Sequence, residues 1–394
     1  MIGRIRFSSA LLAATLIFST AAPAGAAGHS ANARMGQIRA MTQNLYVGAD
    51  LHRIVEVADP NQIPFVVADV FHAVETTNFP QRAVEIAREV KEKQPDVIGL
   101  EEVSLIRVQS PSDYFIGNPE KAQTVVYDYL QILLDALAKK GLHYRVASQV
   151  TESDMELPAF AGLDPQTGAP KFNDIRLTDR DVILARSNVF TANPMGANYQ
   201  TTLEIPVAGG ITIPFTRGYT AVDATVRGKT WRVVDTHLEE RDSDSLAGIQ
   251  AGQAQELISV LATETKPVLL LGDMNSSPTD PDVPTLGVVT PYRQFVGAGF
   301  TDSWVHSVHD DGPGYTCCEL ETLDNPTPTL DQRIDYVFYR PEMLGPAMQK
   351  TRLYADLVGN DVDDKSASEL WPSDHAGLYA RVRIPVATPS LASH

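Results

Sequence analysis

The most constraining feature of this chain is the alternation of short apolar segments with amphipathic segments of helical period. The apolar segments have the length of buried strands, whereas the amphipathic ones carry apolar residues at every third or fourth position. Strands are predicted at 38–45, 96–100, 181–185, 221–226, 231–235, 267–271, 334–339 and 377–384. Such alternation is typical of layered α/β domains, in which helices cover the faces of β-sheets.

The helical period predicts three helices, over residues 81–93, 124–140 and 246–263. Pro80 stands just before the first helix, where proline is favoured. Residues 150–215 are rich in Pro, Gly and Asp, and they are predicted to form a long loop or hairpin insertion that contacts substrate. Residues 49–79 are predicted to be a second irregular excursion.

The first 26 residues differ from the rest of the chain. Arg4 and Arg6 precede an apolar stretch over 11–18, and Ala24-Gly25-Ala26 is typical of a cleavage site. The apolar stretch is too short to serve as a membrane anchor. The sequence therefore predicts a secretory signal peptide and a secreted or periplasmic protein. The expected organisation is a signal peptide over 1–26, a flexible leader over 27–37, one domain over 38–386 and a tail over 387–394.

The composition excludes some classes of protein. Hydrophobic residues make up 43% of the 394-residue chain, which excludes a disordered protein. The chain has 32 basic and 49 acidic side chains and a formal net charge of −17. A nucleic acid would therefore need a local basic patch or bound cations for contact.

The chain has only two cysteines, and they are adjacent, Cys317 and Cys318. Consecutive Cα atoms lie about 3.8 Å apart, which is below the usual span of a disulfide. We expect these residues to stay unbonded as small apolar residues at a strand end, so that no disulfide framework supports the fold.

Polar clusters occur at the ends of the apolar strands or close to them: Asn44, Glu101-Glu102, Thr236-His237, Asp273-Met274-Asn275 and Asp335. In α/β proteins, functional sites gather where strands end. Asp335 lies within its predicted strand, where an unpaired carboxylate would be costly. A histidine partner would remove that cost, and His375 is the candidate.

These residue types are the ones that metal-assisted phosphoester hydrolysis requires. Mg²⁺ binds through one or two carboxylates and several waters. A histidine held by a carboxylate can take a proton from the attacking water. Asparagine and a second histidine can hold phosphoryl oxygens.

Six motifs, taken in order, resemble those of the endonuclease/exonuclease/phosphatase superfamily: Gln43-Asn44, Pro95–Val103, Thr236–Leu238, Gly272–Asn275, Arg333–Val337 and Ser373–His375. The resemblance covers residues 38–386 and implies a catalytic domain there. That superfamily includes deoxyribonucleases, abasic-site endonucleases, bacterial sphingomyelinases and inositol-phosphate phosphatases. The implied fold is an α/β four-layer sandwich, with two packed β-sheets flanked by helices.

The resemblance also implies a metal site. Glu102 matches the glutamate that binds Mg²⁺, for which Mn²⁺ could substitute. Asn44 matches the asparagine near metal and phosphate, and Asp374 matches an acid that contributes to the metal site. The family usually has Gln-Glu where this chain has Glu101-Glu102, so which carboxylate faces the metal stays open.

The remaining matches imply catalytic roles. His375 and Asp335 resemble the His-Asp pair that activates water, and Asp273 resembles the aspartate that orients this water or binds metal. His237 and Asn275 resemble the groups that hold phosphoryl oxygens.

The resulting hypothesis is a secreted Mg²⁺-dependent phosphodiesterase that hydrolyses a phosphoester by in-line attack of water. A nucleic acid, a membrane lipid headgroup and a small organophosphate all remain as substrates, and no obligate protein partner is evident. The alternatives are a secreted nuclease, a sphingomyelinase-like hydrolase and an inactive binding protein on the same scaffold. Arg180 and Arg217 could touch substrate phosphate, although a surface ion pair is the commoner role of such residues.

Overall fold

The computed structural model describes residues 35–207, 211–284, 287–308, 312–342 and 351–385. The predicted signal peptide, the predicted tail and the leader up to residue 34 lie outside these ranges. The last three residues of the predicted leader, 35–37, already belong to the first strand. Among the described residues, no helix combines the length and the apolar character that crossing a bilayer requires.

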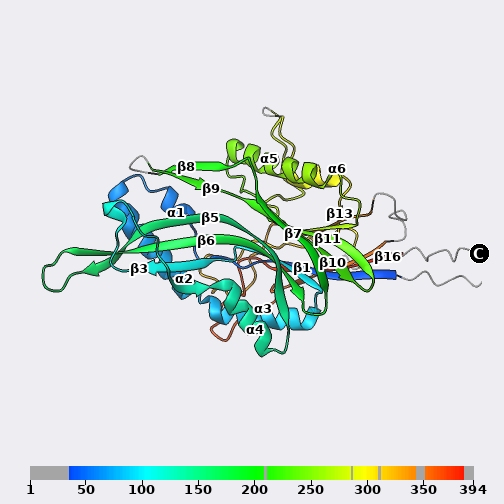
Figure 1. Cartoon of the computed structure of the whole chain (residues 1–394), viewed down its shortest axis with the longest axis horizontal. Helices are drawn as coiled ribbons and strands as arrows, with labels where there is room; N and C mark the ends of the chain where they lie inside the picture. Colours follow the sequence, from blue (N-terminus) through cyan, green and yellow to red (C-terminus); the bar gives the residue numbers. More distant parts are fainter. Residues whose placement is uncertain (1–34, 208–210, 285–286, 309–311, 343–350, 386–394) are drawn as a thin grey trace, which may run out of the picture. The chain divides into compact units, whose positions relative to one another are not determined.

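Two β-sheets form the centre of this region, and each is built from strands that are distant in sequence (Figure 1). The larger sheet runs in the order β15-β16-β1-β2-β6-β3-β4, and β5 pairs with β6. Its strands are β1 Met35–Asn44, β2 Val97–Glu101, β3 Leu105–Gln109, β4 Thr124–Asp128, β5 Tyr144–Leu163, β6 Pro170–Arg186, β15 Arg352–Val358 and β16 Gly377–Pro385.

The smaller sheet runs in the order β13-β14-β12-β11-β10-β7. Its strands are β7 Phe190–Asn198, β10 Gly218–Val226, β11 Lys229–His237, β12 Val268–Asp273, β13 Thr301–Asp302 and β14 Asp335–Arg340. A separate two-stranded hairpin is formed by β8 (Leu203–Val207) and β9 (Ile211–Phe215).

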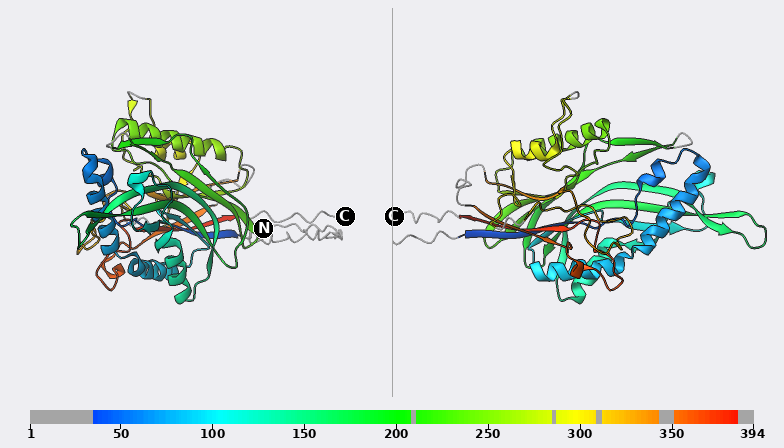
Figure 2. Two further views of the ribbon diagram at one scale, coloured as in Figure 1. Left: turned by 60° about the vertical axis from the view of Figure 1, so that its left-hand side comes forward. Right: turned by 180° about the vertical axis from the view of Figure 1, so that it is seen from behind.

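The helices lie outside the two sheets. They are α1 His52–Val55, α2 Ile63–Thr76, α3 Phe79–Lys93, α4 Tyr129–Lys139, α5 Asp244–Leu261 and α6 Pro291–Gly297, with short 3₁₀ turns at Pro60–Gln62, Tyr114–Ile116 and Val362–Asp364. Helices α3 and α4 share a core with the outer face of the larger sheet, and α5 and α6 share one with the smaller sheet. Figures 1 and 2 show these two pairs of helices on opposite sides of the sheets.

The inner faces of the two sheets pack against each other through apolar side chains. Ile38, Val97 and Ile183 of the larger sheet share one buried cluster with Val233 and Leu269 of the smaller sheet. Burying these inner faces removes a large apolar area from water, which is the main force holding the sheets together. The predicted four-layer α/β sandwich is confirmed.

The predicted helix over 124–140 begins too early. Residues 124–128 form β4, which pairs with β3, and the helix begins only at Tyr129. Thr124, Val125 and Val126 are β-branched, and such side chains favour a strand over the first turn of a helix.

The two segments predicted to be irregular are largely regular. Residues 150–215 are dominated by the long β5–β6 hairpin and by β7, so the hairpin alternative holds and the loop does not. Residues 49–79 contain α1 and α2. Helix α2 buries a stripe formed by Ile63, Val67, Val70 and Val74, and this helical spacing is visible in the sequence.

Candidate active site

A cavity of about 690 Å³ opens beside the ends of β1, β11 and β12, and we call it the catalytic cavity. Its lining includes Glu102, His237, Asp273, Asn275, Asp374 and His375. The other two predicted site residues, Asn44 and Asp335, contact this group through hydrogen bonds. The structure thus brings all eight predicted site residues together.

Strand pairing aligns three of these residues in the smaller sheet. His237 ends β11 and is the register partner of Asp273, which ends β12. Asp273 lies in turn opposite Asp335, the first residue of β14. Paired residues on neighbouring strands have their Cα atoms about 5 Å apart. The sheet therefore sets the spacing of these three side chains.

Asn44 links the larger sheet to this row. It ends β1, and its Nδ2 donates to Glu102 Oε1 at 3.1 Å and to Asp273 Oδ2 at 3.2 Å. Its Oδ1 accepts the backbone N–H of Tyr46 at 2.9 Å. The backbone N–H of Val47 donates to Glu102 Oε2 at 2.7 Å. Asn44 and Val47 together hold the carboxylate of Glu102 in place.

The two adjacent glutamates face different surroundings. Glu101 is fully buried and accepts a hydrogen bond from Thr42 Oγ1 at 2.6 Å. Burial, with repulsion from Asp235, raises the pKa of Glu101 well above its usual range. Glu102 follows the end of β2 with a φ of 54° and lines the catalytic cavity. Glu102 is therefore the carboxylate available to a metal.

His375 is paired with a buried carboxylate. Its Nδ1 lies 2.9 Å from Asp335 Oδ2, and because a carboxylate only accepts, Nδ1 donates. Nε2 is left for the cavity and lies 4.0 Å from Asp374 Oδ1. Burial lowers the pKa of His375, but the carboxylates of Asp335 and Asp374 outweigh this effect and raise it well above its usual range.

Asp273 lies between the two histidines. Its Oδ2 is 3.5 Å from His237 Nε2 and 3.8 Å from His375 Nδ1, and its Oδ1 accepts the backbone N–H of Asn275 at 2.8 Å. Burial and repulsion from Asp335 raise the pKa of Asp273 to about 7. The Asn275 side-chain nitrogen lies 3.1 Å from His237 Nε2, so both polar groups face the same part of the cavity.

An arginine defines the tautomer of His237. Arg217 Nη1 lies 2.9 Å from His237 Nδ1. A guanidinium only donates, so Nδ1 accepts, and the hydrogen of the neutral ring is on Nε2, 3.5 Å from Asp273 Oδ2. The Asn275 amide nitrogen near Nε2 donates to the carbonyl oxygen of Leu238 at 3.0 Å instead. Burial, with the positive charges of Arg217 and His375, lowers the pKa of His237 well below its usual range. The site thereby gains a neutral N–H donor at Nε2.

Arg217 itself is buried, with 4% of its surface exposed. Three carboxylates surround its guanidinium, those of Glu152 at 3.5 Å, Asp179 at 3.7 Å and Glu239 at 3.8 Å. The expected surface ion pair is therefore wrong for Arg217, because the long strands β5 and β6 bury it. Arg180 donates to Asp128 at 2.7 Å and to the carbonyl oxygen of Val103 at 2.9 Å, which joins β6 to its neighbours.

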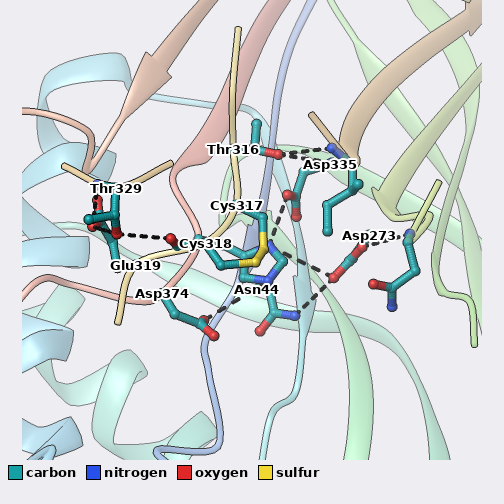
Figure 3. The surroundings of a disulfide bond; sticks show 12 residues. Asn44, Asp273, Thr316, Cys317, Cys318, Glu319, Thr329, Asp335 and Asp374 are labelled. Carbon is teal, nitrogen blue, oxygen red and sulfur yellow. Dashed lines mark hydrogen bonds and ion pairs between the residues drawn. A yellow bond between two sulfur atoms is a disulfide. The ribbon is translucent and has the colours of Figure 1, made fainter. Parts of the chain in front are cut away.

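The two cysteines form a disulfide that lines the catalytic cavity, and this corrects the expectation that they stay unbonded. The peptide bond between Cys317 and Cys318 is cis. The backbone of Cys317 pairs with His375. Figure 3 shows the disulfide close to Asn44, Asp273, Asp335 and Asp374.

The donor set fits a hard divalent cation. Burial and repulsion from Asp374 raise the pKa of Glu102, and burial raises the pKa of Asp374. Two half-buried carboxylates that oppose each other's ionisation are stabilised by a cation between them. Oxygen donors of this kind suit Mg²⁺ and Mn²⁺. Asp273, Asp335 and His375 also bring possible ligand atoms within 4.8 Å of one another.

Comparison with known proteins gives the class of this chain. The sequence profile of the endonuclease/exonuclease/phosphatase family matches residues 41–375. A family protein from Beutenbergia cavernae shares the fold with a TM-score of 0.51 and 20% identity, over 90% of this chain and 73% of that one. A family protein from Bacteroides thetaiotaomicron aligns with a TM-score of 0.50 and 14% identity, over 90% of this chain and 100% of that one. A comparison with curated proteins found no match.

The chain belongs to the endonuclease/exonuclease/phosphatase family. Members of this family are metal-dependent phosphoester hydrolases, so the predictions of family and of enzyme class are confirmed. Truncated TDP2 of Caenorhabditis elegans also aligns, with a TM-score of 0.46 and 15% identity, over 88% of this chain and 98% of that one.

Proposed function

We propose that this chain is a secreted, Mg²⁺-dependent phosphodiesterase. One observation carries the proposal. The His375–Asp335 pair, with its 2.9 Å contact, opens on the same cavity as the half-buried carboxylates of Glu102 and Asp374. A base at His375 and a cation at Glu102 and Asp374 would lie beside each other, which supports the proposal. Secretion rests on the signal-peptide pattern of residues 1–26 alone.

In the proposed mechanism, His375 acts as the general base. Its Nδ1–H donates to Asp335, which aims Nε2 into the cavity, where the unprotonated nitrogen takes a proton from water. Asp273 helps to orient that water. When bound by Glu102 and Asp374, Mg²⁺ would polarise the phosphoryl group and stabilise the leaving oxygen. A cation there also opposes the protonation of His375 that the carboxylates favour.

In the same mechanism, His237 and Asn275 hold the phosphoryl oxygens. His237 donates from Nε2, because Arg217 occupies Nδ1. The Asn275 amide donates beside it. Both groups are neutral donors that are fixed before the reaction, so they stabilise charge as it develops on the phosphoryl group.

The alternatives differ in how well they suit this cavity. An inactive binding protein would not require all eight residues to converge. A nuclease is disfavoured by the net charge of −17, which repels a polyanion at a distance. A sphingomyelinase-like hydrolase remains as an alternative function.

The test is hydrolysis of a substrate panel with Mg²⁺ and with EDTA. The panel contains plasmid DNA, RNA, sphingomyelin, inositol phosphates and a chromogenic phosphodiester. His375→Ala is expected to reduce the rate by about two to four decades, which is the usual contribution of one general base. His72→Ala is the matched control, because the side chain of His72 is 80% exposed on α2.

The proposal predicts loss of activity with EDTA and with His375→Ala, and full activity of the His72 variant. Unchanged hydrolysis after both chelation and His375→Ala would refute it. Cleavage of DNA or RNA alone would establish the nuclease in place of the general phosphodiesterase.

A further inference from the structure

A second, wholly apolar cavity adjoins the catalytic cavity. It measures about 80 Å³ and lies between helices α1 and α2 and strands β3, β5 and β6. We call it the side chamber. Six side chains line both cavities, and they are Val47, Leu51, Val55, Met155, Leu177 and Phe215. The two cavities therefore adjoin along these six side chains, and we call this boundary the entrance of the side chamber.

The entrance of the side chamber lies next to the residues proposed to act on phosphorus. Val47 lines both cavities, and its backbone N–H donates to Glu102 Oε2 at 2.7 Å. Phe215 also lines both, and its ring centroid lies 5.0 Å from the guanidinium of Arg217, which contacts His237. A phosphoester bound between Glu102 and His237 would thus have one substituent at the entrance of the chamber.

The lining of the side chamber selects an apolar group. All of its lining residues are apolar, so a polar or charged group placed there would lose its hydrogen bonds to water without replacement. Its volume is roughly half that of the ~150 Å³ apolar cavity that takes a benzene ring. A short alkyl group of about three or four carbons fits this space, whereas a nitrophenyl ring does not.

The negative charge of the catalytic cavity limits how many phosphates a substrate can carry. Eleven acidic side chains and two arginines line it, and one of those arginines, Arg217, already faces three carboxylates. A substrate with a single phosphate meets this surface with the least repulsion. A nucleic acid brings one charge per nucleotide.

We propose that the side chamber binds the short alkyl arm of a small phosphodiester with one phosphate. This inference rests on the proposed phosphodiesterase function and adds the substrate class to it. Burial of each methylene contributes about 0.8 kcal/mol, which corresponds to roughly fourfold in kcat/KM.

The test uses a series of alkyl 4-nitrophenyl phosphates with methyl, ethyl, propyl, butyl, hexyl and octyl arms, assayed with Mg²⁺. We expect kcat/KM to rise by roughly fourfold per methylene up to propyl or butyl and then to level off. Equal kcat/KM along the series, or a steady rise through octyl, would overturn the side chamber as the site of a short arm.

Two substitutions in the chamber test its size. Ile175 lines the side chamber but not the catalytic cavity. Ile175→Phe is expected to reduce the butyl-to-methyl ratio of kcat/KM at least tenfold, and Ile175→Ala is expected to shift the preferred arm to a longer one. Val146→Phe and Val146→Ala are the matched controls, because Val146 lies on β5, is 38% exposed and lines neither cavity. Each ratio is taken within one variant, so partial loss of folded protein cancels.

Binding without turnover separates the two proposals. Isothermal titration compares methylphosphonate with butylphosphonate in the presence of Mg²⁺. Tighter binding of butylphosphonate without hydrolysis of any ester would support the chamber and refute the phosphodiesterase. Hydrolysis of the esters with equal binding of the two phosphonates would refute the chamber alone.

Discussion

At the scale of single residues, the contact between Arg217 and His237 is the least expected feature of the site. Arg217 donates to His237 Nδ1 at 2.9 Å, so the neutral imidazole presents its N–H from Nε2. Without this contact, either ring nitrogen could carry the hydrogen. In the proposed mechanism Arg217 is therefore a positioning residue, because it would act on phosphorus only through His237.

Substitution of Arg217 tests this role. Arg217→Met is expected to lower kcat by about 10- to 100-fold, a range typical of partners that orient a site residue. Arg217→Lys should recover part of the loss, because it restores a donor with positive charge. Nitrogen NMR of the His237 ring should show the Nε2–H tautomer in the parent and a mixture in Arg217→Met. A pure Nε2–H tautomer in Arg217→Met would contradict the assignment.

At the scale of elements, strand ends explain why so much of the site could be predicted. His237, Asp273 and Asn44 each end an apolar strand. Sheet register brings His237 beside Asp273, and the packing of the two sheets brings Asn44 to Asp273. Arg217 could not be assigned this way, because its burial depends on Glu152 and Asp179, which come from other strands.

The fold class could also be predicted from the sequence, but the order of the strands could not. The alternation of strands and helices indicates α/β, but the order of strands in each sheet depends on long-range pairing that periodicity does not encode. Helix α2 shows a helical stripe in its sequence, although the composition of residues 49–79 predicts an irregular segment. The start of α4 was misplaced because Val126 fits the helical stripe while its β-branched neighbours favour a strand.

The packing of the two sheets leaves a carboxyl pair between them. Asp235 of β11 faces Gly99 and Glu101 of β2, and a Cβ at Gly99 would lie 2.0 Å from Asp235 Oδ1. Glycine at position 99 is therefore required by the carboxylate opposite. Burial raises the pKa of Asp235 to about 7.

This pair makes stability depend on pH. The folded pKa of Asp235 lies above its unfolded value of about 3.9, so the folded state holds the proton more tightly. The stability is therefore fully present below about pH 4 and falls as the pH rises toward 7. Asp235→Asn should raise the free energy of unfolding at pH 8 by on the order of a few kcal/mol and have little effect at pH 4.

Urea unfolding at pH 4 and pH 8 measures this difference. Asp69→Asn is the control, because Asp69 is exposed on α2. An equal effect of Asp235→Asn at the two pH values would show that the carboxyl pair does not hold a proton in the folded protein.

At the scale of the whole molecule, negative charge is the dominant property. The chain carries a net charge of −17, and its catalytic cavity collects eleven acidic side chains. Such a concentration of carboxylates opposes folding unless cations neutralise part of it. The cation proposed for catalysis would therefore also stabilise the folded protein.

The last prediction follows from this link. If Mg²⁺ binds the folded state through Glu102 and Asp374, as proposed, it should raise the melting temperature by a few degrees. At a concentration of about 100 times Kd, the gain in free energy is about 2.7 kcal/mol. Glu102→Gln should abolish this gain, and it should also raise the melting temperature without metal, because it removes the repulsion from Asp374.

Glu92→Gln is the control, since the Glu92 side chain is 63% exposed on α3. NaCl at equal ionic strength measures general screening of the acidic surface. If NaCl stabilises the protein as much as Mg²⁺ does, or if Glu102→Gln keeps the full response to Mg²⁺, the cation does not bind at Glu102.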